Sequence, residues 1–232
     1  MGDDHLDNMD ETPIFLDMPH EFSVNTKGAH HINVRTTGHQ KSRVSVVLCC
    51  SASGRKAKPL VILKRKSNKL PRLPVGGRWP AGVEVVCHNK GWMDVGGMRS
   101  WFNRCYLPYQ HSRLFFRTGS TVLTMDSLRS HLDPEVKKMY RQAGAHIAIV
   151  PSGCTSVVQP LDVGVNKVFK GHLRGYWNEW MANPANHSYT NQNNLRAPPV
   201  WLVCQWIERA WGAIQPSTIQ NAFLCMQAYN LY

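Results

Sequence analysis

The sequence has few acidic residues for its length and no long apolar run. Asp and Glu together number 15, against 27 Lys and Arg in 232 residues, and the formal net charge is +12. No stretch approaches the roughly 20 apolar residues that a membrane-spanning helix needs. The acidic start, MGDDHLDNMDE, lacks the apolar core of a signal peptide. The basic excess favours a polyanionic partner, nucleic acid first and an acidic membrane surface second.

Cysteine pairs with metal-binding spacing are also absent. The seven cysteines include no CxxC pair, and several lie within apolar runs. This pattern is typical of reduced and mostly buried thiols in an intracellular protein. His30 and His31 have no second pair of ligands to complete a zinc motif, so we expect no zinc site. Hydrophobic residues make up 43% of the chain, which is enough for a packed globular core.

What is present is a group of β-prone runs, followed by strands that alternate with helices. Residues 41–50 and 59–64 predict the two strands of a hairpin, and 83–87 predict a third strand. Further strands are predicted at 121–125 and 146–150. This order favours an α/β protein, with a mixed sheet and helices packed on it.

Helices are expected after each of the last three strands. The first begins near Asp94, and the third spans about 160–181; both have apolar residues at helical spacing. The middle helix has the clearest boundary signals. Asp133 is placed to cap it, Pro134 suits its first position, and Gly144 ends it.

The chain is expected to hold one large domain with short additions. We assign residues 1–8 to an acidic tail, 9–181 to the main domain, 182–199 to a linker or exposed loop, and 200–232 to a segment of two short helices. The acids of the tail are expected to be exposed to solvent: Asp3, Asp4 and Asp7.

Two aspartates stand at strand-like positions. Asp126 follows the strand predicted at 121–125, and Asp10 opens an apolar run. Strand ends commonly carry working residues in α/β sheets. Asp is also frequent there because it forms turns, and both readings stay open on the pattern alone.

Asp162 is more informative because it lies on a predicted helix. At 100° per residue, Val165, Phe169 and Trp180 fall within about 60° of it. Asp162 is therefore expected to point toward the sheet with the apolar stripe. A carboxylate there is costly unless it meets metal, cations or hydrogen-bond donors. The alternative is a first-turn Asp that accepts from the helix N–H groups.

Three segments around these acids resemble one family. PSGCTSVVQPLD, which ends at Asp162, resembles the third-acid segment of pogo/Tigger transposases, mariner-like members of the DDE endonuclease superfamily. LTMD, which ends at Asp126, is similar to the second-acid segment, and MDET around Asp10 resembles the first. Asp126 and Asp162 are separated by 35 residues, which suits the family's spacing. The resemblance covers residues 9–181.

The resemblance implies an RNase H-like fold and a metal site. Two acids would lie on neighbouring strands and the third on a helix, and Asp10, Asp126 and Asp162 would share two Mg²⁺ or Mn²⁺ ions. Such ions can activate water and stabilise the leaving oxygen in phosphodiester chemistry. The implied activity is DNA strand cleavage and transfer. A nuclear location and a homodimer are further expectations from the family.

The sequence also departs from the family pattern. Ser127 and Leu128 follow the second acid, where relatives have a polar stretch that begins with Asn. Helix-turn-helix DNA-binding domains precede this core in the family, whereas this chain begins nine residues before Asp10. The alternative function is therefore a domesticated, catalytically inactive module that binds DNA or protein. His131 matches a family position, although a histidine at a helix entry is the alternative reading.

Basic residues concentrate around the predicted hairpin and near the third acid. They are candidates for phosphate contacts, and KRKSNK also resembles a nuclear-import signal. The alternative for the hairpin is lysines that protect a strand edge from unwanted pairing. The candidate nucleic-acid-binding residues are Arg55, Lys56, Lys58, Lys64, Arg65, Lys66, Lys69 and Lys170.

Eight tryptophans are available for stacking on unpaired bases. Trp101, Trp177 and Trp180 lie at helical spacing beside other apolar residues, so core packing is expected for them. Trp79 and Trp92 lie in predicted loops and are better candidates for contact with nucleic acid.

Overall fold

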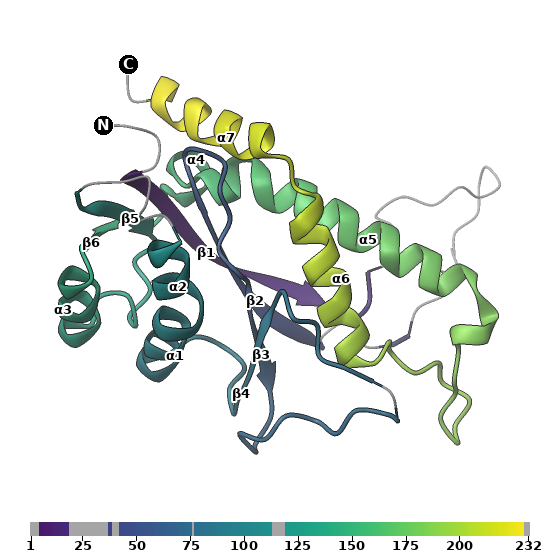
Figure 1. The fold of residues 1–232 in the computed structure, drawn as a ribbon. Coiled ribbons are helices and arrows are strands. Elements are labelled where there is room, and N and C mark those ends of the chain that lie inside the picture. The colour runs from purple at the N-terminus through teal and green to yellow at the C-terminus, as the bar shows by residue number, and fades with distance from the viewer. Residues whose placement is uncertain (1–4, 19–36, 39–41, 76, 113–118, 230–232) are drawn as a thin grey trace.

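A six-stranded mixed sheet forms the centre of the molecule (Figure 1). The computed structural model describes residues 5–18, 37–38, 42–75, 77–112 and 119–229. Strand order across the sheet is β4-β3-β2-β1-β5-β6. The strands are β1 (Leu6–Phe15), β2 (Arg43–Ser51), β3 (Leu60–Lys64), β4 (Glu84–His88), β5 (Thr121–Met125) and β6 (Ala145–Ile149).

The strand pairing confirms the α/β class and the mixed sheet. β2 pairs antiparallel with both β1 and β3, so the predicted hairpin is correct. β4 pairs parallel with β3, and β5 pairs parallel with β1 and β6. β1 and β3 are therefore the strands at which antiparallel and parallel pairing meet.

Helices cover both faces of this sheet. Figure 1 shows α1, α2 and α3 on one side and α5, α6 and α7 on the other. Two π-helical turns interrupt the series, one before α2 and one before α5. In chain order the helical elements are α1 (Val95–Trp101), a π turn (Phe102–Tyr106), α2 (Leu107–His111), α3 (Pro134–Gln142), α4 (Thr155–Val158), a second π turn (Leu161–Val165), α5 (Asn166–Ala182), a 3₁₀ turn (Pro184–Asn186), α6 (Val200–Ala213) and α7 (Pro216–Tyr229).

Each face of the sheet has its own hydrophobic core. Along β2, Val46 and Leu48 pack against α5–α7, whereas Val47 and Cys49 pack against α1–α3. This alternation follows from the two-residue period of a strand. Because β2 is buried on both faces, its sequence is a nearly continuous apolar run.

The predicted boundaries of α3 are confirmed. Asp133 accepts hydrogen bonds from the backbone N–H groups of Glu135 (3.0 Å) and Val136 (3.1 Å). Gly144 follows the helix with a φ of 75°, a left-handed conformation that glycine adopts without strain.

Pro108 does not end the preceding helix, which continues to His111. The π turn Phe102–Tyr106 comes directly before α2. Its wider hydrogen-bond spacing moves the carbonyl that a proline ring would meet in a regular α-helix.

The expectation that Asp7 belongs to a solvated tail is wrong. Asp7 lies in β1 and is fully buried. Its carboxylate accepts hydrogen bonds from Tyr106 Oη (3.1 Å), Tyr109 Oη (3.3 Å) and Gln110 Nε2 (2.9 Å). These donors come from the π turn and α2, far along the chain, so local sequence carries no sign of them. Asp3, Asp4, His30 and His31 lie outside the described residues.

The C-terminal helices pack into the same core as the sheet. Trp206 and Ile207 of α6 and Phe223 of α7 are buried in one cluster with β2 and α5. Trp101, Trp177 and Trp180 are buried as predicted. Among the described residues, no helix is both long and apolar enough to cross a membrane.

The cysteine expectation is confirmed in part. All seven thiols are free, and four of them are buried. Cys154 and Cys225 are exposed, and Cys87 is half-buried.

Candidate metal centre

The pairing of β1 with β5 brings two of the three aspartates to equivalent places. The parallel ladder joins Leu6 to Val122 and ends with Asn8 opposite Thr124. Asp10 and Asp126 each lie two residues beyond that last pair. Because neighbouring parallel strands run side by side at the same rise per residue, the two acids leave the ladder at the same level.

Buried amide side chains tie the third acid's segment to these strands. Asn8 donates to the carbonyl (3.2 Å) and hydroxyl (3.1 Å) of Thr124, and its own oxygen accepts from the N–H of Leu161 (3.0 Å). Gln159 donates to the carbonyl of Met9 (3.0 Å). The start of the π turn is therefore fixed against β1, one residue before Asp162.

The expected burial of Asp162 with the apolar stripe is wrong, because Asp162 is exposed. The helix-wheel argument assumed 100° per residue throughout. The first turn is instead π-helical, with i to i+5 hydrogen bonds and a smaller rotation per residue. Val165, Asn166 and Phe169 occupy the buried face instead.

Asn166 joins Asp162 to Asp10. Its Nδ2 donates to Asp10 Oδ2 (2.8 Å) and lies 3.2 Å from Asp162 Oδ1. Since both oxygens lie this close to one nitrogen, they are at most about 6 Å apart. Asn166 is only 6% exposed, and its Oδ1 is buried without a hydrogen-bond partner among the described residues.

The pKa of Asp10 depends on its burial and on the charges of the other two acids. Burial raises the pKa of Asp10 to about 6, and the negative charge of Asp162 contributes further. Asp126 adds a smaller contribution in the same direction, while the hydrogen bond from Asn166 opposes the shift. The three carboxylates are therefore close enough to repel one another, and a bound cation would relieve that repulsion.

Asp126 is held by His131 on its other side. His131 Nδ1 lies 2.7 Å from Asp126 Oδ1, and Nε2 lies 3.3 Å from Glu11 Oε1 at ion-pair distance, outside hydrogen-bond geometry. The hydrogen bond from His131 holds the pKa of Asp126 below its usual range. Burial alone would lower the pKa of His131, but Asp126 and Glu11 outweigh burial and raise it to about 9. His131 is therefore an imidazolium at neutral pH.

Ser127, which follows Asp126, contacts the loop that leads to Asp162. Ser127 Oγ lies 2.7 Å from Ser152 Oγ, in the loop that leads to the third acid. The loops that follow β5 and β6 are thereby joined. Leu128 donates its N–H to Asp126 Oδ1 (3.0 Å) and completes the turn.

The donor set suits a hard divalent cation, although the ligands are not yet gathered. Carboxylate oxygens are the ligands that Mg²⁺ and Mn²⁺ prefer. Among the described residues, no three His, Cys, Asp or Glu side chains already lie at metal-ligand spacing. The amide of Asn166 lies between Asp10 and Asp162, and Asp126 is directed to His131. Side-chain rotations would be needed for all three carboxylates to share ions.

Two of the candidate nucleic-acid contacts have structural partners. Lys56 Nζ donates to the carbonyls of Trp211 (2.7 Å), Gly212 (3.1 Å) and Ile214 (2.7 Å), at the end of α6. An ammonium has three N–H donors, so none remains for a phosphate. Lys58 forms an ion pair with Glu84 (2.6 Å).

The other candidates lie nearer to solvent. Lys170 lies on α5 and lines a hollow of about 210 Å³ together with Arg174 and the end of β1. Arg55 is half-buried and has interactions within the fold. The exposed members of the hairpin group are Lys64, Arg65, Lys66 and Lys69.

Sequence reasoning missed Asn166 and Glu11 and gave His131 too little weight. Asn166 stands four residues after Asp162, the spacing at which helical side chains meet, so its polarity within an apolar stripe was an available signal. His131 was placed at a helix entry, but it lies before the Asp133 cap and faces the acids. Glu11 had no signal, because its partner is 120 residues away.

The chain is similar to known proteins in sequence and in fold. Residues 41–223 match the sequence profile of a family described as DDE superfamily endonuclease. A mouse (Mus musculus) protein named Pogo transposable element with KRAB domain is 31% identical over 223 residues. The match covers 94% of this chain and 34% of the mouse protein, so the chain spans about a third of that relative.

Solved structures of the Mos1 mariner paired-end complex have the same fold. The complex with Mn aligns with a TM-score of 0.61 at 12% identity, covering 97% of this chain and 53% of that chain. The complex with Mg gives 0.60 at 11% identity, with the same coverage. At these identities the likeness concerns the fold alone, and it confirms the expected RNase H-like architecture. Because the profile match spans most of the residues and the fold agrees with it, this chain belongs to the DDE superfamily endonuclease family.

Proposed function

We propose that this domain binds DNA and cleaves its phosphodiester bonds with divalent metal held by Asp10, Asp126 and Asp162. One observation carries the proposal. Asn166 Nδ2 lies 2.8 Å from Asp10 Oδ2 and 3.2 Å from Asp162 Oδ1, so two acids from segments far apart in the sequence lie close together, and the negative charge of Asp162 helps to raise the pKa of Asp10. Three carboxylates that repel one another in a metal-free protein are what a two-ion site requires.

Two Mg²⁺ or Mn²⁺ ions would supply water activation and stabilisation of the leaving oxygen. The residues of the chain would prepare the acids for that role. Asn166 keeps the carboxylates of Asp10 and Asp162 near each other. His131 keeps Asp126 ionised and oriented. Glu11 holds the far side of the His131 ring by its opposite charge.

DNA as the substrate is supported by charge and by the relatives. The net charge of +12 favours a polyanion, and the similar Mos1 structures are described as paired-end complexes. We extend the proposal to a homodimer and to a nuclear location. The homodimer rests on the family alone, and the nuclear location rests on the family and on the basic run KRKSNK.

A plasmid-nicking assay tests the proposal. Purified protein is incubated with supercoiled plasmid in Mg²⁺ or Mn²⁺, and Asp126→Asn, Asp162→Asn and the exposed-surface control Glu135→Gln are compared with wild type. We expect nicking by wild type and by Glu135→Gln, and none by the two Asp variants. Nicking that persists in folded Asp162→Asn would contradict the assigned site.

A second candidate is a domesticated module that binds DNA without cutting it. The specific observation in its favour is that Asn166 and His131 already bond to the acids without metal. DNA binding without nicking at saturating metal, in a protein supplied with a DNA-binding domain, would favour this candidate.

A further inference from the structure

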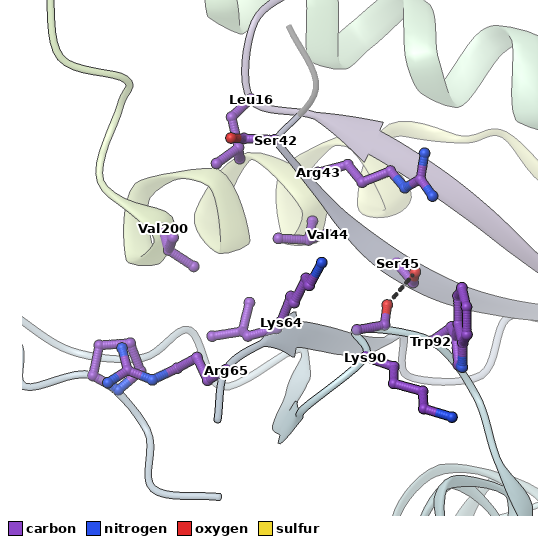
Figure 2. A pocket seen from close by; sticks show the side chains of 13 residues that line it. Leu16, Ser42, Arg43, Val44, Ser45, Lys64, Arg65, Lys90, Trp92 and Val200 are labelled. Carbon is purple, nitrogen blue, oxygen red and sulfur yellow. Dashed lines mark hydrogen bonds between the residues drawn. The ribbon is translucent and has the colours of Figure 1, made fainter. Parts of the chain in front are cut away.

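A basic cavity lies at the ends of β2 and β3, away from the three aspartates. It encloses about 570 Å³. Figure 2 shows Arg43 and Ser45 on β2, Lys64 at the end of β3, and Lys90 and Trp92 on the neighbouring loop. Apolar side chains form another part of its wall: Leu16, Val44, Leu63, Pro71 and Val200.

The charge of this cavity is of one sign. Arg43, Lys64, Arg65 and Lys90 line it, and all four are exposed. No carboxylate in the described part of the chain forms an ion pair with any of them. The sequence from Phe22 to Val83 contains no Asp or Glu at all. The charges of these four basic side chains are therefore available to an anionic ligand.

Trp92 provides an aromatic surface at the mouth of the cavity. Its side chain is 54% exposed, although most other large apolar side chains are buried. The loop that presents it is fixed, because Ser45 Oγ donates to the carbonyl of Gly91 (2.8 Å; Figure 2). Gly91 has a φ of 75°, and a Cβ there would lie 2.7 Å from Lys64 Cβ. Trp92 is thus held in solvent by a close loop–strand contact.

We infer that this cavity binds an unpaired stretch of the DNA strand, with a base stacked on Trp92 and phosphates at the four basic side chains. A cavity of this volume accommodates a group the size of a nucleotide and excludes the width of a duplex. Positive charge beside an exposed aromatic ring is the combination by which proteins hold single strands without sequence preference. The inference rests on the proposed function for its choice of DNA.

The cavity and the acids lie at different places along β2. Arg43 and Ser45 lie three to five residues along β2 from Leu48, which pairs with Asp10. At about 3.4 Å per residue, that is roughly 10–17 Å along the sheet. The side chains of Arg43 and Ser45 leave β2 on the face opposite to that of Leu48, so a strand held in the cavity would pass around the sheet to reach the acids.

The test measures binding of labelled oligothymidine by fluorescence anisotropy in EDTA, with a blunt duplex for comparison. We expect Trp92→Ala to weaken oligothymidine binding about tenfold, and Trp92→Phe to restore most of it. Arg43→Gln should lower the slope of log affinity against log salt by about 0.7. Lys138→Gln, on α3 at another surface, should leave both affinity and slope unchanged.

The outcomes separate this inference from the proposed function. Oligothymidine affinity that is equal in wild type, Trp92→Ala and Arg43→Gln would overturn the inference, even if the plasmid is nicked. Affinity that depends on Trp92 would support it, even if no nicking occurs, because EDTA removes the metal from the measurement. Tighter binding of oligouridine than of oligothymidine would overturn the assignment to DNA. Thermal unfolding identifies any variant that has not folded. If Trp92→Ala does not fold, the comparison of oligothymidine affinity between wild type and Arg43→Gln tests the inference.

Discussion

The side-chain amide of Asn166 lies 2.8 Å from the carboxylate of Asp10, which joins α5 to β1. The same nitrogen lies 3.2 Å from Asp162. In the absence of metal, a neutral hydrogen-bond donor thus lies between two like charges. We regard Asn166 as the residue that keeps the two acids together until a cation binds.

Replacing Asn166 should therefore destabilise the metal-free protein. Asn166→Ala removes the shared donor and should lower the free energy of unfolding by roughly 1–2 kcal/mol in EDTA, measured by urea denaturation. Asn103, an exposed helical asparagine, is the matched control, and Asn103→Ala should cost less than about 0.5 kcal/mol. Equal effects of the two variants would contradict a bridging role for Asn166.

Asp10 should make stability depend on pH in the acidic range. Its pKa in the folded protein is about 6, above the ordinary value of 3.8, so the folded state favours the protonated form. The stabilisation is complete below about pH 4 and is lost as pH rises through 6. In EDTA, the free energy of unfolding of wild type should fall by on the order of 2 kcal/mol between these two pH values, relative to that of Asp10→Asn. A constant difference between the two proteins across this range would refute the predicted coupling.

The titration of His131 should cause a second loss of stability, at higher pH. Its pKa is raised from 6.5 to about 9, so its stabilising charge is fully present below about pH 6.5 and disappears as pH rises through 9. We expect the free energy of unfolding of wild type to fall by on the order of 2–3 kcal/mol between about pH 6.5 and pH 9. His131→Gln should show a much smaller slope, whereas His111→Gln, at an exposed site, should keep the wild-type slope. Denaturant titrations at several pH values measure all three.

Much of the fold was predictable because its signals are local. The five predicted strands and the α3 boundaries depend on apolar period, on Asp133 and on Gly144, and each acts within its own segment. The prediction that Asp7 is exposed to solvent failed because its three hydrogen-bond donors lie about 100 residues away in the sequence. A buried acid with distant partners has the same local sequence as a solvated one.

The resemblance proposed the three acids, whereas nothing in the sequence predicted most of the residues that surround them. The π turn after Pro160 changed the direction of Asp162, and a helical wheel with a fixed angle per residue has no means of showing such a turn. The contacts of Glu11 and Ser127 depend on how loops meet across the sheet. Such contacts follow from tertiary packing and leave no periodic pattern in the sequence.

Lys56 should prove to be a structural residue. Its three hydrogen bonds cap the end of α6, so Lys56→Met should lower the free energy of unfolding by roughly 1–3 kcal/mol. Its effect on duplex DNA affinity should be no larger than that of Lys138→Gln. Chemical denaturation and anisotropy check the two parts. A strong loss of DNA affinity at unchanged stability would assign Lys56 to the DNA surface instead.

The most direct test of the metal centre is calorimetric titration of Mn²⁺ into the purified protein at about pH 7.5. Wild type and Asp162→Asn are compared, with Glu135→Gln as an exposed acidic control. We predict that wild type and Glu135→Gln bind Mn²⁺ with the same stoichiometry and that Asp162→Asn loses most of the affinity. Equal Mn²⁺ binding by wild type and folded Asp162→Asn would contradict the account.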